Sequence, residues 1–386
     1  MKRIIFIISC WFCYACYAQP AGTRFFFASK QCRDSVTQHL KQQIDATLNL
    51  PFATSNSTSW MSAFWAMELM LYKPAFYAAR IPKQIQELPT TDPVFQRSFF
   101  EMLYTLYPLE FSKEVKSVWT QIQSDKVKAI ALEYLALSNV SVDINEDKTF
   151  TKSVYFHPYN YVRNKSSFNL PARKNFLDSS FLPGQTVLCS FQSADRNQPG
   201  YLMIRTADGR WLADENGKEF RFPQLARAIS NLPFYLTNGN TPQGLYRING
   251  FDFSNNNWIG PTPNLQMCLP FETAANPFFT SNTAFEETYE NLLGSGLSGF
   301  KTLWESFLAG KLGRTEIIAH GTTINPDYYK SQLYYPNTPS LGCLCSPEEW
   351  NDEGQLLFSS QQHWVNVVQQ FNPMPNYLLV ADILDL

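Results

Sequence analysis

Apolar residues recur at helical spacing along the N-terminal part of the chain. Trp60, Phe64 and Met67 fall on one helical face, and the spacing recurs over residues 92–107 and 111–137. We expect the aromatic residues of these segments to form a core. No strict period establishes a helical repeat, although pairs of helices stacked as an arm fit the pattern.

Two of these segments carry further signals. Asp92-Pro93 has the features of a helix start, because the carboxylate can cap the first turn and proline is favoured at its first position. The apolar run from Trp60 to Tyr72 contains Glu68 and is too short to cross the ~30 Å of hydrocarbon in a bilayer. We therefore expect a core helix here and no transmembrane helix in the mature chain.

The pattern changes in the second half of the chain. Residues 146–196 are irregular and interrupted by prolines and asparagines, so we interpret them as a connector. From Gly200 the residues alternate as in strands, and Tyr201–Arg205 and Trp211–Ala213 predict a hairpin. Further strands are predicted at residues 244–248, 315–319 and 377–380.

The N-terminus predicts export. A short basic start, residues 1–3, precedes the apolar run Ile4–Phe12, and Cys16-Tyr17-Ala18 has the form of a small-residue cleavage site. Residues 1–18 are thus interpreted as a signal peptide, which places the mature chain in the periplasm or cell envelope. Lipid attachment at Cys16 is the alternative interpretation.

Charge and cysteine content narrow the function classes. Removing residues 1–18 takes away two basic residues and no acid, so the formal charge changes from -2 to -4. No basic patch for nucleic acid is implied. Three of the eight cysteines lie in the predicted leader, and the remaining five are an odd number, so at least one thiol stays free of intramolecular pairing. The four histidines show no His-x-x-x-His spacing, and we expect neither a metal site nor an organic cofactor.

The strongest candidate for chemistry is a cysteine and histidine pair. Cys343 lies in Ser340-Leu341-Gly342-Cys343-Leu344 and follows His320-Gly321 along the chain. A thiol with its ordinary pKa near ~8.5 needs a base such as His320 to become a nucleophile at neutral pH. Gly342 would allow a substrate carbonyl to approach, and Ser340 would hold the turn or orient the imidazole. Backbone N–H groups around Cys343 would stabilise an oxyanion. A structural role is the alternative for both side chains, since free cysteines are usually buried.

This arrangement resembles the L,D-transpeptidase catalytic domain. The motif of that family, His-Gly followed by Ser/Thr-x-Gly-Cys, matches His320-Gly321 and Ser340–Cys343, and Thr241-Pro242-Gln243-Gly244 matches an upstream Thr-Pro-x-Gly landmark. The resemblance covers residues 197–386. Cys345 departs from it, because the family carries Arg or Asn two residues after the nucleophile. Residues 283–310 are an inserted helical segment that would cap the site or alter its substrate.

The resemblance implies an envelope enzyme that acts on peptidoglycan stem peptides. Cys343 would form a thioester acyl-enzyme, and His320 would transfer the protons. An amine acceptor would give a crosslink, whereas water would make the enzyme a carboxypeptidase. Gly321, Leu341 and Tyr335 are the candidate substrate-binding positions, with the tyrosines near Tyr335 predicting either a lid or ordinary packing.

Two other functions remain open. The chain could be a degenerate cell-wall-binding or scaffold protein without turnover, or a hydrolase of peptidoglycan peptide links. The fold class predicted is α+β multidomain, with a signal peptide (1–18), an α-helical domain (19–145), a connector (146–196) and a mainly β L,D-transpeptidase-like catalytic domain (197–386). The helical domain would recruit an envelope protein partner or position the second domain.

Overall fold

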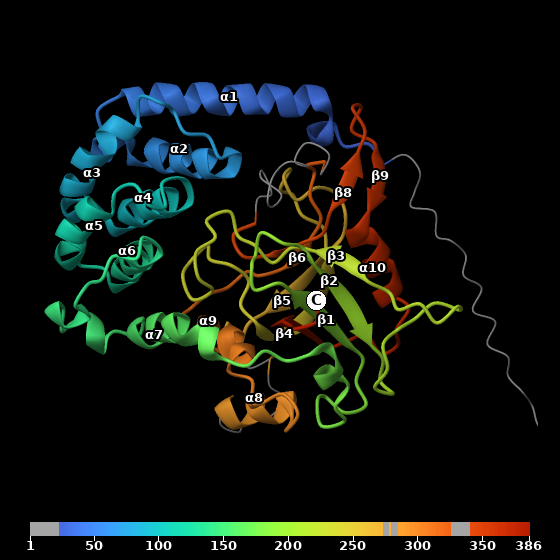
Figure 1. Cartoon of the computed structure of the whole chain (residues 1–386). Coiled ribbons are helices and arrows are strands. Elements are labelled where there is room, and N and C mark those ends of the chain that lie inside the picture. The colour runs from blue at the N-terminus through green and yellow to red at the C-terminus, as the bar shows by residue number, and fades with distance from the viewer. Residues whose placement is uncertain (1–22, 273–277, 279–284, 326–339) are drawn as a thin grey trace, which may run out of the picture.

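The computed structural model describes residues 23–272, 278, 285–325 and 340–386. The predicted leader, with Cys16, lies outside these residues. Figure 1 shows an arm of helices beside a body built on a β-sheet, so the α+β class is confirmed. No helix in the described part of the chain combines the length and the apolar character needed to cross a membrane.

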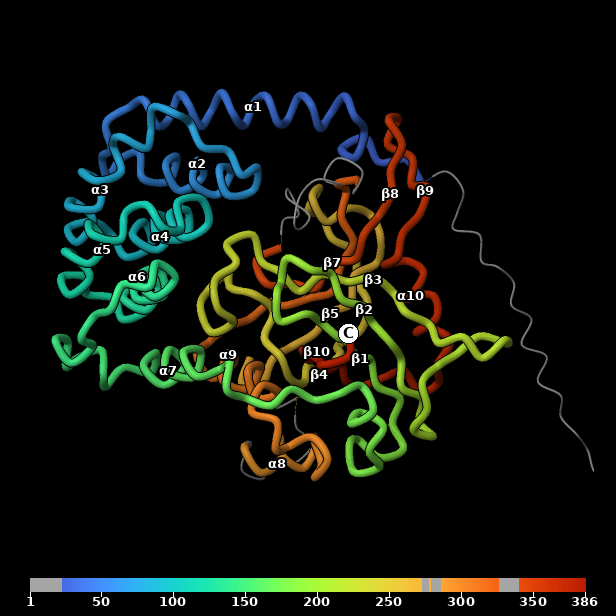
Figure 2. Tube along the Cα trace, in the orientation of Figure 1, coloured from blue at the N-terminus to red at the C-terminus, as the bar shows by residue number. Residues whose placement is uncertain are grey.

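The arm is formed by helices that alternate between two rows. Helix α2 contacts α4 and α4 contacts α6, while α3 contacts α5 beside them. Figure 2 traces the chain along α1, down through α2–α6 and back to the body through α7. Stacking of helices as an arm is one of the arrangements that the helical spacing in the sequence allowed. The helices are α1 (Lys30–Asn49), α2 (Ser57–Met70), α3 (Ile81–Glu87), α4 (Pro93–Leu106), α5 (Ser112–Val118), α6 (Asp125–Leu137) and α7 (Phe156–Asn164).

Two predictions for the arm are confirmed, the core helix over the apolar run and the helix start at Asp92-Pro93. Trp60, Phe64 and Met67 of α2 are buried in the core, so the apolar run is a core helix. Helix α4 begins at Pro93, and the Asp92 carboxylate accepts a hydrogen bond of 2.7 Å from the Val94 N–H. Such a cap stabilises a helix by ~1 kcal/mol, because it satisfies an amide that has no partner within the helix.

The body contains an eight-stranded mixed sheet with the order β3-β2-β1-β10-β4-β5-β6-β7. The pairs β1/β10 and β6/β7 are parallel, and the other neighbours are antiparallel. The strands are β1 (Val187–Gln192), β2 (Gly200–Arg205), β3 (Phe222–Gln224), β4 (Gly244–Asp252), β5 (Asn264–Cys268), β6 (Ala319–His320), β7 (Leu344–Cys345) and β10 (Tyr377–Asp382), with a separate hairpin of β8 (Glu348–Trp350) and β9 (Leu356–Ser359).

The sheet is buried on both faces. Leu378 of β10 belongs to a core that continues into the arm, whereas Leu379 packs in a second core with residues of α8 and α9. Successive strand residues point to opposite faces, so one strand can serve both cores. The remaining helices are α8 (Phe285–Leu293), α9 (Glu305–Lys311) and α10 (Ser360–Val368). Helices α8 and α9 lie within the predicted insertion and its immediate continuation.

One predicted strand is much shorter than expected. The sequence predicted a strand over residues 315–319, but only Ala319 and His320 pair in β6. Glu316 adopts a left-handed backbone with a φ of 61°, which an extended strand does not allow. His320 is the last residue of the short strand. The sheet also starts at Val187, within the segment interpreted as a connector.

The arm meets the body at its beginning, middle and end. Before α1, the Phe25 N–H donates to the Gly354 carbonyl in the turn between β8 and β9, at 2.7 Å. In the middle, the Asn238 amide donates to Glu101 of α4 at 3.0 Å. At the end, Tyr161 of α7 donates to the Lys301 carbonyl at 3.1 Å. The middle contact matters for the site, because the loop of residues 229–240 also contacts the segment around Cys343.

Candidate active site

The segment Ser340–Cys343 forms a tight turn that leads into β7. The Ser340 hydroxyl accepts from the Gly342 N–H at 3.2 Å and donates to the Cys343 carbonyl at 2.8 Å. Gly342 has a φ of +119°, a conformation that side chains rarely adopt. The expectation that Ser340 holds the turn is confirmed. Glycine is needed at position 342 because other residues rarely adopt this backbone conformation.

The upstream landmark of the resemblance contacts this turn. The Thr241 hydroxyl donates to the Gly342 carbonyl at 2.8 Å. Gly244 begins β4 with a φ of +123°, and a Cβ there would lie 2.4 Å from the Tyr289 hydroxyl. Two motifs far apart in the sequence thus meet in the fold, where each requires a glycine.

His320 is held as a neutral base. Its Nδ1 lies 2.6 Å from the Gly321 carbonyl oxygen, which can only accept, so we assign the proton to Nδ1 and the basic lone pair to Nε2. The side chain is 1% exposed. Burial lowers the pKa of His320 from its ordinary value, with the Gly321 carbonyl opposing this shift.

The strand register places His320 near Cys343. His320 of β6 is the partner of Cys345 in the parallel β7, and Cys343 lies two residues earlier along the same strand direction. Strand spacing of about 4.8 Å and a rise of about 3.3 Å per residue put the Cα atoms of His320 and Cys343 about 8 Å apart. The register therefore places the predicted base and nucleophile on neighbouring backbone segments.

The thiol of Cys343 is in its resting, protonated state. It donates to the Glu316 carbonyl at 3.6 Å and accepts from the Ile318 N–H at 3.5 Å. Burial raises the pKa of Cys343 to about 11; the nearby Glu316 adds to the increase, while the Ile318 N–H and Arg314 oppose it. No hydrogen bond joins Cys343 to His320 among the contacts of the described residues. The site therefore contains a neutral thiol and a neutral imidazole, so a nucleophilic role for Cys343 would require transfer of the thiol proton.

The hydrogen bonds of the turn leave one candidate among the backbone amides predicted to stabilise an oxyanion. The Gly342 N–H donates to Ser340, and the Leu344 N–H donates to the Ile318 carbonyl at 3.0 Å. The Cys343 N–H has no acceptor among the described residues. If Cys343 is the nucleophile, this amide is the one expected to donate to the oxyanion.

Cys345 is a packing residue. It is 0% exposed, and its thiol lies 3.7 Å from the Gly321 carbonyl. Burial raises its pKa well above the ordinary value, and Glu348 adds to this effect. The five cysteines in the described part of the chain, Cys32, Cys189, Cys268, Cys343 and Cys345, are all free thiols. Within the same described ranges, no three His, Cys, Asp or Glu residues are grouped closely enough to hold a metal ion.

Sequence reasoning missed Glu348, whose carboxyl lies beside Gly321. A Cβ on Gly321 would lie 2.4 Å from the Glu348 carboxyl, so this carboxyl fills the space beside the glycine. Glu348 accepts from the Thr322 N–H at 3.2 Å and from the Ser359 hydroxyl at 2.5 Å. Burial raises the pKa of Glu348 to about 8. Gly321 is therefore needed for this contact, and the side its Cβ would occupy is closed to substrate.

Arg314 is the second residue that the sequence did not identify. Its guanidinium is buried and donates to the Gly239 carbonyl at 2.9 Å and the Leu341 carbonyl at 3.3 Å. A Cβ on Gly342 would lie 2.2 Å from the Arg314 Nη2 atom. An arginine in the loop before a two-residue strand has no sequence motif that would have marked it.

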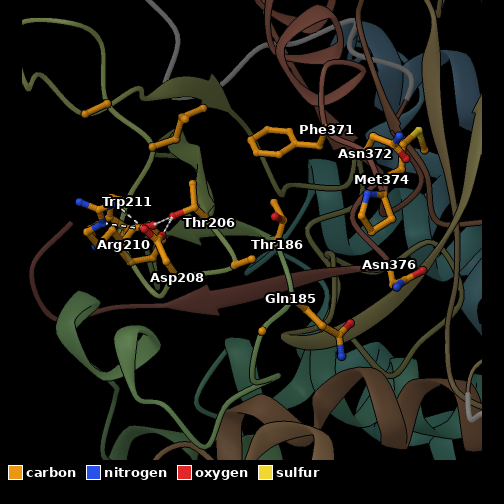
Figure 3. A pocket seen from close by; sticks show the side chains of 15 residues that line it. Gln185, Thr186, Thr206, Asp208, Arg210, Trp211, Phe371, Asn372, Met374 and Asn376 are labelled. Atoms are coloured by element: carbon orange, nitrogen blue, oxygen red, sulfur yellow. Dashed lines mark hydrogen bonds and ion pairs between the residues drawn. The ribbon is translucent and has the colours of Figure 1, made fainter. Parts of the chain in front are cut away.

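Leu341, another predicted substrate-binding position, lies at the surface beside the arm. Leu341 is 43% exposed and lines a cavity of about 170 Å³ with Trp65, Glu68 and Glu101 of the arm. Tyr335 lies outside the described residues. A larger cavity of about 660 Å³, shown in Figure 3, is formed near Trp211 and Phe371 and includes none of the predicted site residues.

Comparison with known proteins found no match to a protein-family model, to a curated protein or to a solved structure.

Proposed function

We propose that the chain is an exported, cysteine-dependent L,D-transpeptidase acting on peptidoglycan stem peptides. The observation that carries the proposal is the pairing of β6 with β7, which brings a neutral His320 beside the strand that follows a partly exposed Cys343. The motif resemblance supplies the substrate class, and the predicted leader supplies the compartment. No cofactor takes part in this chemistry.

The first half of the reaction is acylation. Nε2 of His320 takes the proton of the Cys343 thiol while the sulfur attacks the carbonyl carbon at the L-centre that precedes a terminal D-residue. The Cys343 N–H stabilises the oxyanion. When the C–N bond breaks, the imidazolium returns the proton to the departing amine, which leaves a thioester on Cys343.

The second half transfers the acyl group. An amine of a neighbouring stem loses a proton to His320 and attacks the thioester, the C–S bond breaks, and the thiolate recovers the proton. A new peptide crosslink is formed and the thiol is regenerated. Water in place of the amine gives a free carboxylate, which is carboxypeptidase activity.

Product analysis tests this function. Purified peptidoglycan, or tetrapeptide-containing muropeptides from it, is incubated with the mature chain and the products are identified by mass spectrometry. We expect crosslinked dimers or tripeptide products with the parent protein and none with Cys343→Ala. The same products at the same rate from Cys343→Ala would overturn the proposal.

A binding or scaffold role is the second candidate, and one observation favours it. The resting thiol has a pKa of about 11 and bonds to backbone groups instead of the imidazole. In that case the body would hold stem peptides while the arm recruits an envelope protein. Peptidoglycan binding without any product would support this role, whereas cleavage of existing crosslinks would support the hydrolase alternative.

A further inference from the structure

Arg314 carries a buried positive charge without a carboxylate partner. The guanidinium is 7% exposed, and its hydrogen bonds go to the carbonyls of four residues. The comparably buried Arg196 and Lys128 each pair with an aspartate. Within the described residues, no carboxylate lies within ion-pair distance of Arg314. A buried cation left in this state is costly unless a counter-charge forms nearby.

The acceptors of Arg314 come from two segments that meet at the nucleophile. Phe234, Gly239 and Asn240 belong to the loop that also contacts the arm, and Leu341 belongs to the turn before Cys343. Arg314 therefore fastens the turn to the loop. The glycine at position 342 leaves the space that the guanidinium occupies, because a Cβ would overlap it.

Two groups near Arg314 can carry a negative charge, the Tyr246 phenol and the Cys343 thiol. Burial raises the pKa of Tyr246 well above its ordinary value, so the phenol stays neutral in the working range. The thiol is partly exposed and can react. It is thus the group whose anionic form would neutralise the buried charge.

We propose that Arg314 is the positioning residue for Cys343, fixing the turn at Gly342 and supplying the positive charge against which the thiolate forms. The family that the chain resembles carries Arg or Asn at the position of Cys345. In this chain, Arg314 supplies a cation from the segment before β6 instead. The inference rests on the proposed function for its role in turnover. Its electrostatic part concerns the thiol alone and can be measured without any peptide.

The test is the pH dependence of Cys343 alkylation by iodoacetamide in the mature chain, followed by mass spectrometry of the Cys343 peptide. Arg314→Lys and Arg314→Gln both lose the planar fork, and they differ in charge. We expect Arg314→Gln to raise the apparent pKa of Cys343 by about one unit, which is a tenfold slower reaction at a fixed pH below that pKa. Arg314→Lys should restore most of the rate.

Arg205 offers a matched control. It is also buried, donates to the carbonyls of Phe181 and Leu182, and lies near another cysteine, Cys189. Arg205→Gln should leave the Cys343 profile unchanged. Circular dichroism checks the fold of each variant.

Equal alkylation profiles for folded Arg314→Lys and Arg314→Gln would overturn the inference. If Arg314→Gln fails to fold, Arg314→Lys decides alone: a profile close to that of the parent supports the inference, and an upward shift of about one unit or more contradicts it. A chain that forms no peptidoglycan product but shows the charge dependence would refute the proposed function and leave this inference standing. A chain that forms crosslinks, but whose Cys343 alkylation does not depend on the charge at position 314, would support the proposed function and refute this inference.

Discussion

Two regions of the body combine a buried arginine with a cysteine, and they differ in what the cysteine can do. Arg205 lies near Cys189 on the central strands, and Arg314 lies near Cys343 at the end of the sheet. Burial raises the pKa of both thiols, to about 12 for Cys189 and about 11 for Cys343. The cation alone therefore does not distinguish a nucleophile from a core residue.

The two cysteines differ in their exposure to solvent and in whether a histidine lies on a neighbouring strand. Cys189 is 0% exposed and lies in β1 between β2 and β10, where both neighbours cover its backbone. Cys343 follows a glycine turn, is partly exposed, and precedes the strand that pairs with the strand of His320. On the proposed function, we therefore expect reactivity at Cys343 and none at Cys189.

The largest effect is expected from exchanging each cysteine for alanine. Cys343→Ala should abolish turnover while the protein stays folded, because it removes the attacking sulfur. Cys189→Ala should retain turnover and lower the free energy of unfolding by about 1 kcal/mol, because it removes a buried group. Urea unfolding and product analysis measure the two effects. Cys345→Ala should also retain much of the activity, and its complete inactivity would point to a chemical role for that thiol.

The next effect concerns the base. His320→Gln should lower kcat/KM by about 10²- to 10⁴-fold, because general acid–base transfer contributes on that order. Replacement of the exposed His363, whose ring contacts Phe222, serves as the control and should change kcat/KM little. A His320→Gln enzyme with full activity would show that another group takes the thiol proton.

The pH profile sharpens the assignment of protonation states. The pKa of His320 is lowered by burial, so the imidazole becomes neutral, and thus active as a base, below its ordinary value of 6.5 as pH rises. The acid limb of kcat/KM should therefore have its midpoint below 6.5. An acid limb above 6.5 that disappears in His320→Gln would contradict the neutral resting imidazole.

The turn before Cys343 can be tested against an open turn elsewhere. Gly342→Ala places a Cβ at 2.2 Å from Arg314 and at 2.6 Å from the Gly239 carbonyl, in a left-handed backbone. Gly209 also has a positive φ, of +80°, but has no atom within 4 Å of such a Cβ. Gly209→Ala should cost ~1 kcal/mol from backbone strain alone. Gly342→Ala should cost more and also slow alkylation of Cys343, and equal costs would argue against the close packing of the turn.

The smallest effect is a change in how stability depends on pH. The pKa of Glu348 in the folded protein is about 8, above its ordinary value of 4.5, so the fold favours the protonated carboxyl. This contribution is full below the unfolded pKa and is lost as pH rises through about 8. The urea concentration at the unfolding midpoint should thus decrease as the pH rises from about 5 to about 9. The decrease should be smaller in Glu348→Gln. Glu349→Gln, at an exposed neighbour, should keep the slope of the parent.

The sequence predicted those features that depend on local pattern. The helical spacing of α2, the cap at Asp92 and the turn held by Ser340 follow from nearby residues, and all three are confirmed. The short β6 was not predicted, because the left-handed backbone of Glu316 depends on its tertiary surroundings. Arg314 and Glu348 were missed for a similar reason, since their roles arise from contacts with glycines distant in sequence.

The most direct test of Cys343 as an activated nucleophile is mass spectrometry of the mature protein after exposure to a carbapenem. Members of the family that the chain resembles accept this β-lactam as an acylating mimic of their substrate. The account predicts a single covalent adduct on Cys343 in the parent protein and none in Cys343→Ala. An adduct that persists in Cys343→Ala, or a parent protein that stays unmodified while Cys343 is readily alkylated, would contradict it.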